Sequence, residues 1–444
     1  MPHVLITPDY PTNAVIGPLQ DHGCRVIVVG NARDLAYLKP FGCAFLEPDS
    51  FIGPEGVGAA VAQVRVQLEQ DQRFQWQGRP LRLGGPEDWR VLESTVNRAF
   101  GLTRAVRELH ARDPLDLVVV HEEISAENCA LLTFARRHGV PSLHIPHGAW
   151  LYRGLHDRAN PHALPLADYQ TLAGEGCLFG LPCPPARDLL AITGNPEFDR
   201  YSTFDLRWER ALARRRMGVS GVRPVVSFLS SAAWCGHVEA RQIEEAIERS
   251  YRAVLRASRA LGFDVVCKLH PASDDALHDR VENEVGTAPV ARSRTDFQAC
   301  VAVADLVVVH GPSNGVIEAV LMGQPTIVID GFEGAPAVWS VRSDSAAIEA
   351  ALAEALAGDS LGKFRARLAE GRDEFIRRYN VANDGAAAER VADVASRVAG
   401  ATAGAWRVRW TRAVRLHRPS ATWLRVRTLA ARGRDRLRGF GSWQ

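Results

Sequence analysis

Residues 305–330, DLVVVHGPSNGVIEAVLMGQPTIVID, read as a strand, a tight loop, a helix and a second strand. The apolar run 305–309 is rich in β-branched residues, which predicts a buried strand. The loop HGPSNG follows at 310–315, and a helix is expected over 314–322, where Gly-Gln-Pro ends it. Residues 326–329 form the next expected strand. The sequence therefore predicts a βαβ unit in the C-terminal half of the chain.

The loop of this unit suits an anion. The first N–H groups of a helix have no internal acceptor, and the helix dipole adds partial positive charge there. Gly311 and Gly315 let the backbone approach a phosphate, while Ser313 and Asn314 add polar side chains. Glu318 lies one turn into the helix, where a carboxylate accepts hydrogen bonds from ribose hydroxyls. We predict a nucleotide site here; the alternative is an ordinary helix N-terminus with an exposed glutamate.

Composition limits the class of protein. A chain of 444 residues with 46% apolar and 23% charged residues is typical of a globular protein of two or three domains. No apolar run reaches the 18 or so residues that a membrane-spanning helix needs, and MPHVLITPDY lacks the features of a secretory signal. The eight cysteines are scattered without a C-x-x-C pair, which favours a cytoplasmic location.

The basic charge is confined to residues 401–444, which hold eleven arginines and one aspartate and carry +10 against −8 for the rest. Trp406, Trp410 and Val414 fall on one side at helical spacing, with arginines around them. This pattern is typical of a helix lying in an anionic membrane surface. We expect the tail to dock the protein on the inner face of the cell membrane. A solvated tail and a nucleic-acid contact are the alternatives, and no nucleic-acid partner is expected.

The rest of the chain alternates strands and helices, which predicts an α/β fold with two Rossmann-like parallel-sheet domains facing each other across a cleft. The predicted strands are 3–7, 25–29, 117–120, 142–145 and 189–193, then 224–229 and 263–269. The predicted helices include 57–71, 87–112, 125–138 and 205–217, and helices at 344–357, 361–378 and 382–399 are expected to close the C-terminal domain. Residues 151–188 are predicted to be surface loops. The expected domains are 1–200, a linker 201–223, a second domain 224–400 and the basic tail 401–444.

His147, in HIPHGAW, is the candidate catalytic base. It follows a predicted strand, and ligands of open parallel sheets gather beyond the carboxyl ends of the strands. An imidazole with its ordinary pKa near 6.5 can take a proton from a hydroxyl near neutral pH. Glu122 and Glu123 follow the preceding strand and are alternative bases. The alternative for all three is a structural role in their loops.

The segment HGPSNGVIEAVLMGQPTIVI resembles the donor-binding segment of GT-B glycosyltransferases, and GNPEFDR at 194–200 resembles the end of their first domain. The resemblance is nearest to the bacterial capsule and teichoic-acid transferases, the CDP-glycerol glycerophosphotransferase-like group. It implies transfer of a glycosyl or glycerophosphoryl group from a nucleotide sugar or CDP-alditol to a hydroxyl acceptor. A lipid-linked acceptor at the membrane surface would explain the basic tail. His147-Gly148 resembles the family's catalytic His-Gly, with Pro146 where an aromatic residue is usual.

The resemblance also assigns donor contacts. His270-Pro271 in VVCKLHP resembles a family motif that contacts donor phosphate, and strand alternation puts Lys268 on the same face as His270. Ser230 and Ser231 are further candidates for the donor phosphates, with N-capping as their alternative role.

The sequence also bears on metals and stereochemistry. No metal or other cofactor is expected, since Asp274 and Asp275 lie at a helix start, where carboxylates favour the dipole. The second glutamate of the Glu-x7-Glu pair of retaining enzymes is Thr326 here, which favours an inverting displacement. The rival functions are a UDP-N-acetylglucosamine 2-epimerase-like isomerase of the same fold and a non-catalytic nucleotide-sugar-binding protein.

Overall fold

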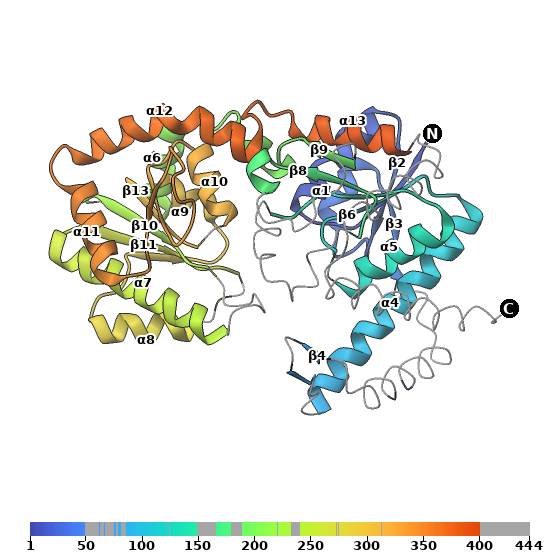
Figure 1. Ribbon diagram of the computed structural model, residues 1–444, viewed down its shortest axis with the longest axis horizontal. Helices are drawn as coiled ribbons and strands as arrows, with labels where there is room; N and C mark the ends of the chain where they lie inside the picture. The colour runs from blue at the N-terminus through green and yellow to red at the C-terminus, as the bar shows by residue number, and fades with distance from the viewer. Residues whose placement is uncertain are drawn as a thin grey trace, which may run out of the picture.

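The computed structural model describes most of residues 1–399, in the order shown in Figure 1. The described residues are 1–48, 62, 66, 75–76, 79–80, 86–123, 125–148, 166–178, 189–219, 221–231, 240–271, 273, 275–311 and 313–399. Most of the predicted helix 57–71 and all of the basic tail 401–444 lie outside this part of the chain.

The N-terminal domain is built on a seven-stranded sheet in the order β3-β2-β1-β6-β7-β8-β9, and all its strand pairs are parallel. Its strands are β1 His3–Ile6, β2 Arg25–Val29, β3 Ala44–Leu46, β6 Leu117–Val120, β7 Ser142–His144, β8 Tyr169–Leu172 and β9 Leu190–Ile192. The order reverses between β1 and β6, the place where open α/β sheets bind ligands.

The C-terminal domain repeats this plan with a six-stranded parallel sheet in the order β12-β11-β10-β13-β14-β15. Its strands are β10 Val225–Leu229, β11 Asp264–Lys268, β12 Ala291–Ser293, β13 Leu306–His310, β14 Thr326–Ile329 and β15 Trp339–Val341. Here the order reverses between β10 and β13. A short antiparallel pair, β4 Gln75–Trp76 and β5 Arg79–Pro80, completes the described strands.

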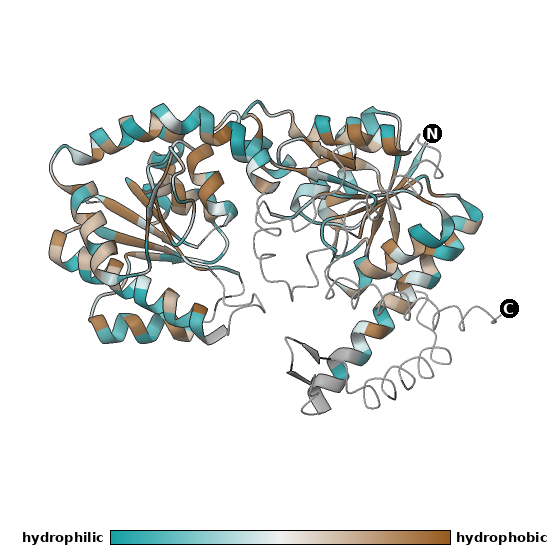
Figure 2. Cartoon of the chain, in the orientation of Figure 1, coloured by the Kyte–Doolittle hydropathy of each residue, from teal (hydrophilic) through white to brown (hydrophobic). Residues whose placement is uncertain are grey.

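Helices cover both sheets, and the apolar residues of Figure 2 gather on the strands and on the helix faces toward them. The α-helices are α1 Tyr10–Ala14, α2 Ile16–Asp21, α4 Pro86–Arg112, α5 Ala126–His138, α6 Leu206–Arg216, α7 Ala240–Leu261, α8 Asp275–Val285, α9 Phe297–Ala302, α10 Asn314–Leu321, α11 Ser345–Leu356, α12 Ser360–Asn380 and α13 Ala387–Ala399. The 3-10 turns are η1 Ala36–Phe41, η5 Glu175–Leu178 and η7 Pro196–Tyr201. The paired Rossmann-like plan predicted from the sequence is confirmed.

Some elements depart from the prediction. Residues 151–188 were expected to be surface loops, but β8 lies between β7 and β9, and Gln170 to Leu172 are buried. Because β8 has the partly polar sequence YQTL, a search for apolar runs does not predict it as a strand, although neighbouring elements bury both of its faces. The short elements β3, β12, α9 and β15 were also not predicted, because three to six residues carry too little periodicity to be recognised.

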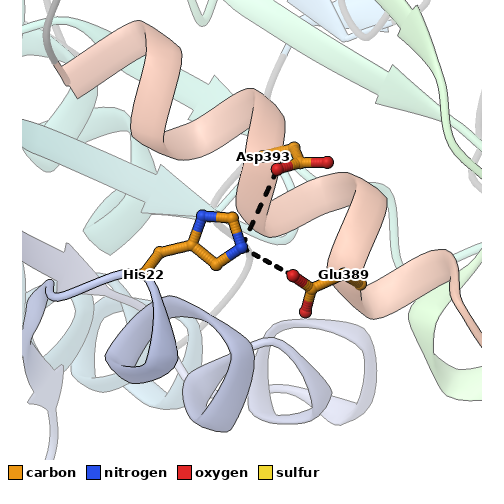
Figure 3. Close-up of side chains that lie close together, drawn as sticks. All are labelled: His22, Glu389 and Asp393. Atoms are coloured by element: carbon orange, nitrogen blue, oxygen red, sulfur yellow. Dashed lines mark hydrogen bonds and ion pairs between the residues drawn. The ribbon is translucent and has the colours of Figure 1, made fainter.

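Helix α13 was expected to close the C-terminal domain, but it packs in the core of the N-terminal domain (Figure 1). Its Val391, Ala395 and Val398 are buried against the residues of β1, β2 and α2. Figure 3 shows His22, just after α2, bonded through Nε2 to Glu389 of α13 at 2.6 Å, with Asp393 at 3.7 Å. An apolar stripe on a helix shows that the helix is buried but not which sheet buries it.

Candidate active site

The loops that follow β1 and β7, near the reversal point of the N-terminal sheet, bring a carboxylate and a histidine together. Asp9 follows β1 at the start of α1, and His147 follows β7. The Nδ1 atom of His147 is hydrogen-bonded to the Asp9 carboxylate. The backbone N–H of His147 donates to the carbonyl of His121 at 3.1 Å, and Nδ1 of His121 lies 3.1 Å from the hydroxyl of Thr7. Three loops at the carboxyl edge of the sheet, those after β1, β6 and β7, thus fix one imidazole.

The pairing sets the protonation of both groups. The hydrogen bond to Asp9 and the carboxylate charge raise the pKa of His147 above its ordinary value, against the effect of burial. Burial alone would raise the pKa of Asp9, but the hydrogen bond and charge of His147 hold it below its usual value. With Nδ1–H donating to Asp9, the lone pair of the neutral ring is on Nε2. The His147 side chain is half exposed, so Nε2 can accept a proton from the hydroxyl of a bound molecule.

The C-terminal domain contacts this histidine directly. The side-chain amide of Asn314, the first residue of α10, donates to the carbonyl of His147 at 3.1 Å. A Cβ on Gly148 would lie 3.1 Å from the Asn314 amide oxygen, so a larger residue would crowd this contact. The predicted base and the predicted anion-binding helix N-terminus are therefore adjacent.

The loop between β13 and α10 has the conformation expected of an anion site. Gly311 has φ 74°, in the left-handed region that favours glycine. Ser313 is the N-cap of α10, but its side chain makes no capping hydrogen bond. Its hydroxyl is therefore not used by the helix, and a bound phosphate can accept a hydrogen bond from it. Gly315 packs closely, since a Cβ there would lie 3.3 Å from the Phe297 ring.

Glu318 is placed differently from the prediction of a ribose contact. Its side chain is 9% exposed, and its Oε1 accepts hydrogen bonds from the Tyr201 hydroxyl at 2.6 Å and from Arg200 Nη2 at 2.8 Å. Both partners belong to η7 of the N-terminal domain. In this arrangement one oxygen of Glu318 holds the two domains together, and a ribose would compete with Arg200 and Tyr201 for it.

Glu197 adds a second carboxyl beside this network. It lies 3.2 Å from Arg200 Nη2, and burial together with the charge of Glu318 raises its pKa to about 7. The charge of His147 acts in the opposite direction. A carboxyl that titrates near neutrality next to a candidate base is a feature of functional sites. Glu197 and Arg200 belong to the GNPEFDR segment, which the sequence identified as a motif but not as part of the site.

Ser230 and Ser231 follow β10 at the reversal point of the second sheet. The hydroxyl of Ser231 is 2.8 Å from Nδ1 of His310, and the hydroxyl of Ser230 is 3.1 Å from Nε2 of His278. Nε2 of buried His310 has no hydrogen-bond partner within the described part of the chain. Burial lowers the pKa of His310 to about 4, so the ring is neutral near neutral pH. The Ser231–His310 pair is therefore the polar group that this end of the sheet offers to a ligand.

Lys268 and His270, both predicted donor contacts, have different surroundings in the fold. Lys268 is buried, and its ammonium donates to the carbonyls of Leu269 at 2.7 Å and Arg294 at 2.9 Å. His270 is half-buried, and burial and the charges of Lys268 and His147 lower its pKa. Arg294 donates through Nη1 to the carbonyls of both His270 and Pro271, at 3.1 and 2.9 Å. The His-Pro turn is thus held by an arginine that follows it in sequence by more than twenty residues.

The two alternative bases have different surroundings. Glu123 is buried, and its Oε1 accepts the backbone N–H groups of Leu166 and Ala167 at 3.0 and 2.7 Å. These bonds hold the segment that leads into β8, which is a structural role. Glu122 is half-buried and 3.5 Å from the amide nitrogen of Asn128, and its charge acts on His147. Glu122 remains the candidate second base near His147.

Asp9 is the main residue that the sequence analysis missed. The signal was present, since Asp9 follows a strand in the same way as His121 and His147 do. Asp9 is the N-cap of α1, which begins at Tyr10, and an acidic residue at a helix start is by itself an ordinary capping residue. Pairing between loops that are 138 residues apart is visible only after folding.

Within the described residues, one group has the composition of a metal site, His22 with Glu389 and Asp393. It is made of surface residues of the α2–α13 contact and shares no residue with the site around His147 (Figure 3). None of the described helices is both long enough and apolar enough to cross a membrane.

The sequence matches no protein-family model and no curated protein. The fold, however, has counterparts among solved structures. A UDP-GlcNAc 2-epimerase from Neisseria meningitidis bound to UDP-GlcNAc matches with a TM-score of 0.54 at 14% identity, over 88% of this chain and 99% of that one. A glycosyltransferase from Rickettsia africae matches with a TM-score of 0.53 at 8% identity, over 90% and 99%. HepE from Anabaena, in complex with UDP and glucose, matches with a TM-score of 0.53 at 13% identity, over 88% of this chain and 98% of that one.

Two Rossmann-like parallel-sheet domains with these structural neighbours define the GT-B fold, and the predicted GT-B architecture is confirmed. At such low identities the likeness concerns the fold. The chemistry has to be argued from the residues of this chain.

Proposed function

We propose that this protein is a GT-B transferase that moves a glycosyl or glycerophosphoryl group from a nucleotide-activated donor to a hydroxyl acceptor in cell-envelope polysaccharide or glycolipid synthesis. The observation that carries the proposal is the Asp9–His147 pair in contact with the N-terminus of α10. A base oriented by a carboxylate can activate the acceptor hydroxyl, and a helix N-terminus beside it can bind the phosphates of the donor. Group transfer needs both functions.

In this mechanism Nε2 of His147 takes the proton of the acceptor hydroxyl, and Asp9 stabilises the imidazolium that forms. The acceptor oxygen attacks the donor in a single, inverting displacement. The leaving nucleotide, a nucleoside diphosphate in glycosyl transfer or CMP in glycerophosphoryl transfer, is held by the α10 N-terminus, by Ser313 and by the Ser231–His310 pair. The helix dipole and these donors stabilise the developing charge, so we propose that the reaction needs no metal. The activity is proposed to take place in the cytoplasm, with the basic tail on the inner membrane face.

A nucleotide screen tests the donor half of the proposal. We expect one of UDP, CDP, CMP, GDP and TDP to raise the melting temperature of the protein clearly more than the others, because binding stabilises the folded state by RT ln(1 + [L]/Kd). If all five fail at millimolar concentration, the donor site is rejected.

The His147→Ala variant tests the chemical half. We expect turnover to fall by about 10²–10⁴-fold while the Kd of the selected nucleotide stays unchanged, because the base acts on the acceptor. Full turnover in this variant rejects His147 as the base. Release of free nucleotide without an acceptor, together with hydrogen exchange at C2 of the sugar, would instead identify an epimerase.

A further inference from the structure

A second cluster of arginines lies at the opposite end of α10 from the candidate active site. Here α6 and α12 meet the turn Gly323-Gln324 that follows α10, around an open pocket of about 360 Å³. Pockets for small ligands have volumes of about 300–1,000 Å³. The pocket is lined by Leu206, Arg207, Arg210, Gly323, Gln324 and Arg365.

Two of the three arginines that line the pocket are fixed in place. Arg210 donates to the Ala304 carbonyl at 2.8 Å and to the Gln324 side-chain oxygen at 3.2 Å. Arg365 donates to the backbone oxygen of Asp305 at 3.2 Å. Gln324 is buried and held by the carbonyls of Val301 and Ala304, at 2.7 and 3.0 Å. A ligand would therefore meet guanidinium groups whose conformational entropy has already been lost on folding.

The positive charge of the cluster is not balanced. Asp305 is the carboxylate that Arg210, Arg214 and Arg365 share, at 3.4, 3.0 and 3.4 Å, and its second oxygen also accepts the backbone N–H of Val225. Exposed Arg207 forms no ion pair within the described part of the chain, and Arg214 Nε is buried there without a hydrogen-bond partner. Glu209, the acidic residue of α6, is two positions from Arg207, and residues two apart do not face each other on a helix.

From this geometry we propose that the pocket is a binding site for a phosphate-bearing anion, separate from the nucleotide site at the α10 N-terminus. Guanidinium groups bind phosphate oxygens in bidentate fashion, and one carboxylate among four arginines leaves such contacts available. A free diphosphate and the phosphate of a lipid headgroup present the same chemistry, so the experiment separates these two sources.

Isothermal titration of the full-length protein with inorganic pyrophosphate tests the site. We expect the double variant Arg207→Gln/Arg365→Gln to bind pyrophosphate at least about tenfold more weakly than the wild type, because two charged hydrogen-bond donors are removed. Arg215→Gln, an exposed arginine of α6 outside the pocket, is the matched control and should bind like the wild type. All titrations contain a saturating concentration of the nucleotide selected above, so that the site at the α10 N-terminus is already occupied and only the second site is measured.

Unchanged binding in the double variant overturns the proposal. If the double variant fails to fold, Arg207→Gln alone decides, since that side chain supports no described ion pair. A parallel co-sedimentation with vesicles of phosphatidylglycerol and phosphatidylcholine identifies the source. Reduced vesicle binding in the variants supports a lipid headgroup, and reduced pyrophosphate binding alone supports a free diphosphate. No change in either measurement rejects both.

Discussion

At the scale of single residues, the pairing of His147 with Asp9 supports the proposed role of His147 as the base. The carboxylate fixes the ring tautomer and favours the protonated imidazole, which in the proposed reaction would make proton transfer from the acceptor easier than for an isolated histidine. The same contact raises the pKa of His147, which means that the resting base is protonated over a wider range of acidic pH.

Asp9→Asn separates these two effects. Removing the carboxylate lowers the pKa of His147 toward its ordinary value, so the acidic limb of the pH–rate profile should move to lower pH. The plateau rate should fall, because the imidazolium loses its partner. The measurement is a pH profile of kcat/KM for both proteins; an unshifted acidic limb would show that Asp9 does not control the base.

Glu123 makes a prediction about stability. Burial raises its pKa to about 7, so the folded protein binds a proton that the unfolded chain has released above about pH 4.5. The free energy of unfolding should therefore fall as pH rises from about 4.5 to 7, by on the order of 1–3 kcal/mol for this group. Glu123→Gln keeps an acceptor oxygen for Leu166 and Ala167 without the charge.

We expect urea denaturation to show Glu123→Gln more stable than the wild type at pH 8 and close to it at pH 4.5. Glu354→Gln, an exposed glutamate of α11, is the control and should change neither value. Equal stabilities of wild type and Glu123→Gln at both pH values would contradict the burial argument.

At the scale of elements, the segment 194–200 is a structural junction as well as part of the site. Gly194 has φ 85° and lies against Ala387. The backbone N–H of Asn195 donates to the Asn380 side chain at 2.8 Å. The Asp199 carboxylate accepts the N–H groups of Ala387 and Ala388 at 2.9 and 2.8 Å. Asp199 therefore caps α13 from a distant part of the sequence.

Asp199→Ala should lower the free energy of unfolding by about 1 kcal/mol, the usual value of a lost helix cap. Asp359 offers a matched control, because it is the N-cap of α12 and makes no side-chain capping bond. Urea denaturation of both alanine variants gives the comparison. A loss of stability in Asp359→Ala equal to that in Asp199→Ala would show that the cap contact is not responsible.

Two substitutions at α10, Ser313→Ala and Glu318→Ala, should have different effects on nucleotide binding and stability. Ser313→Ala should weaken nucleotide binding about two- to tenfold without loss of stability, since the hydroxyl makes no capping bond. Glu318→Ala should lower stability as well, because it leaves Arg200 and Tyr201 without their acceptor. Calorimetry with the selected nucleotide and thermal melts test both. Unchanged binding in Ser313→Ala would mean that the loop does not hold the donor.

The sequence predicted the parts of this fold that are strongly patterned. The unit β13–α10–β14 lies within a residue or two of its prediction, because apolar β-branched runs and Gly-x-Pro are local signals. The position of His147 was predicted for the same reason, from a strand end. Its partner Asp9, the burial of Glu318 under Tyr201 and the docking of α13 depend on contacts between distant segments, which no local pattern contains.

At the scale of the whole molecule, the contrast between a −8 body and a +10 tail remains the basis of the predicted membrane association. Residues 401–444 lie outside the described structure, so the prediction depends on the sequence. Deleting them should abolish co-sedimentation with anionic vesicles and leave nucleotide binding intact, because each basic side chain near an anionic surface contributes on the order of 1 kcal/mol. Equal binding to anionic and neutral vesicles would reject the tail as a membrane anchor.

The return of α13 to the N-terminal domain has a mechanical consequence. The polypeptide passes between the domains twice, once after η7 and once between α12 and α13, and the two passages touch each other where Asn383 donates to the Tyr201 carbonyl at 3.3 Å. Two adjacent connections permit opening about the line that joins them but resist twisting of one domain against the other. If the protein is the proposed transferase, opening along this coordinate separates Asn314 from His147 and so couples product release to the loss of the proposed catalytic arrangement.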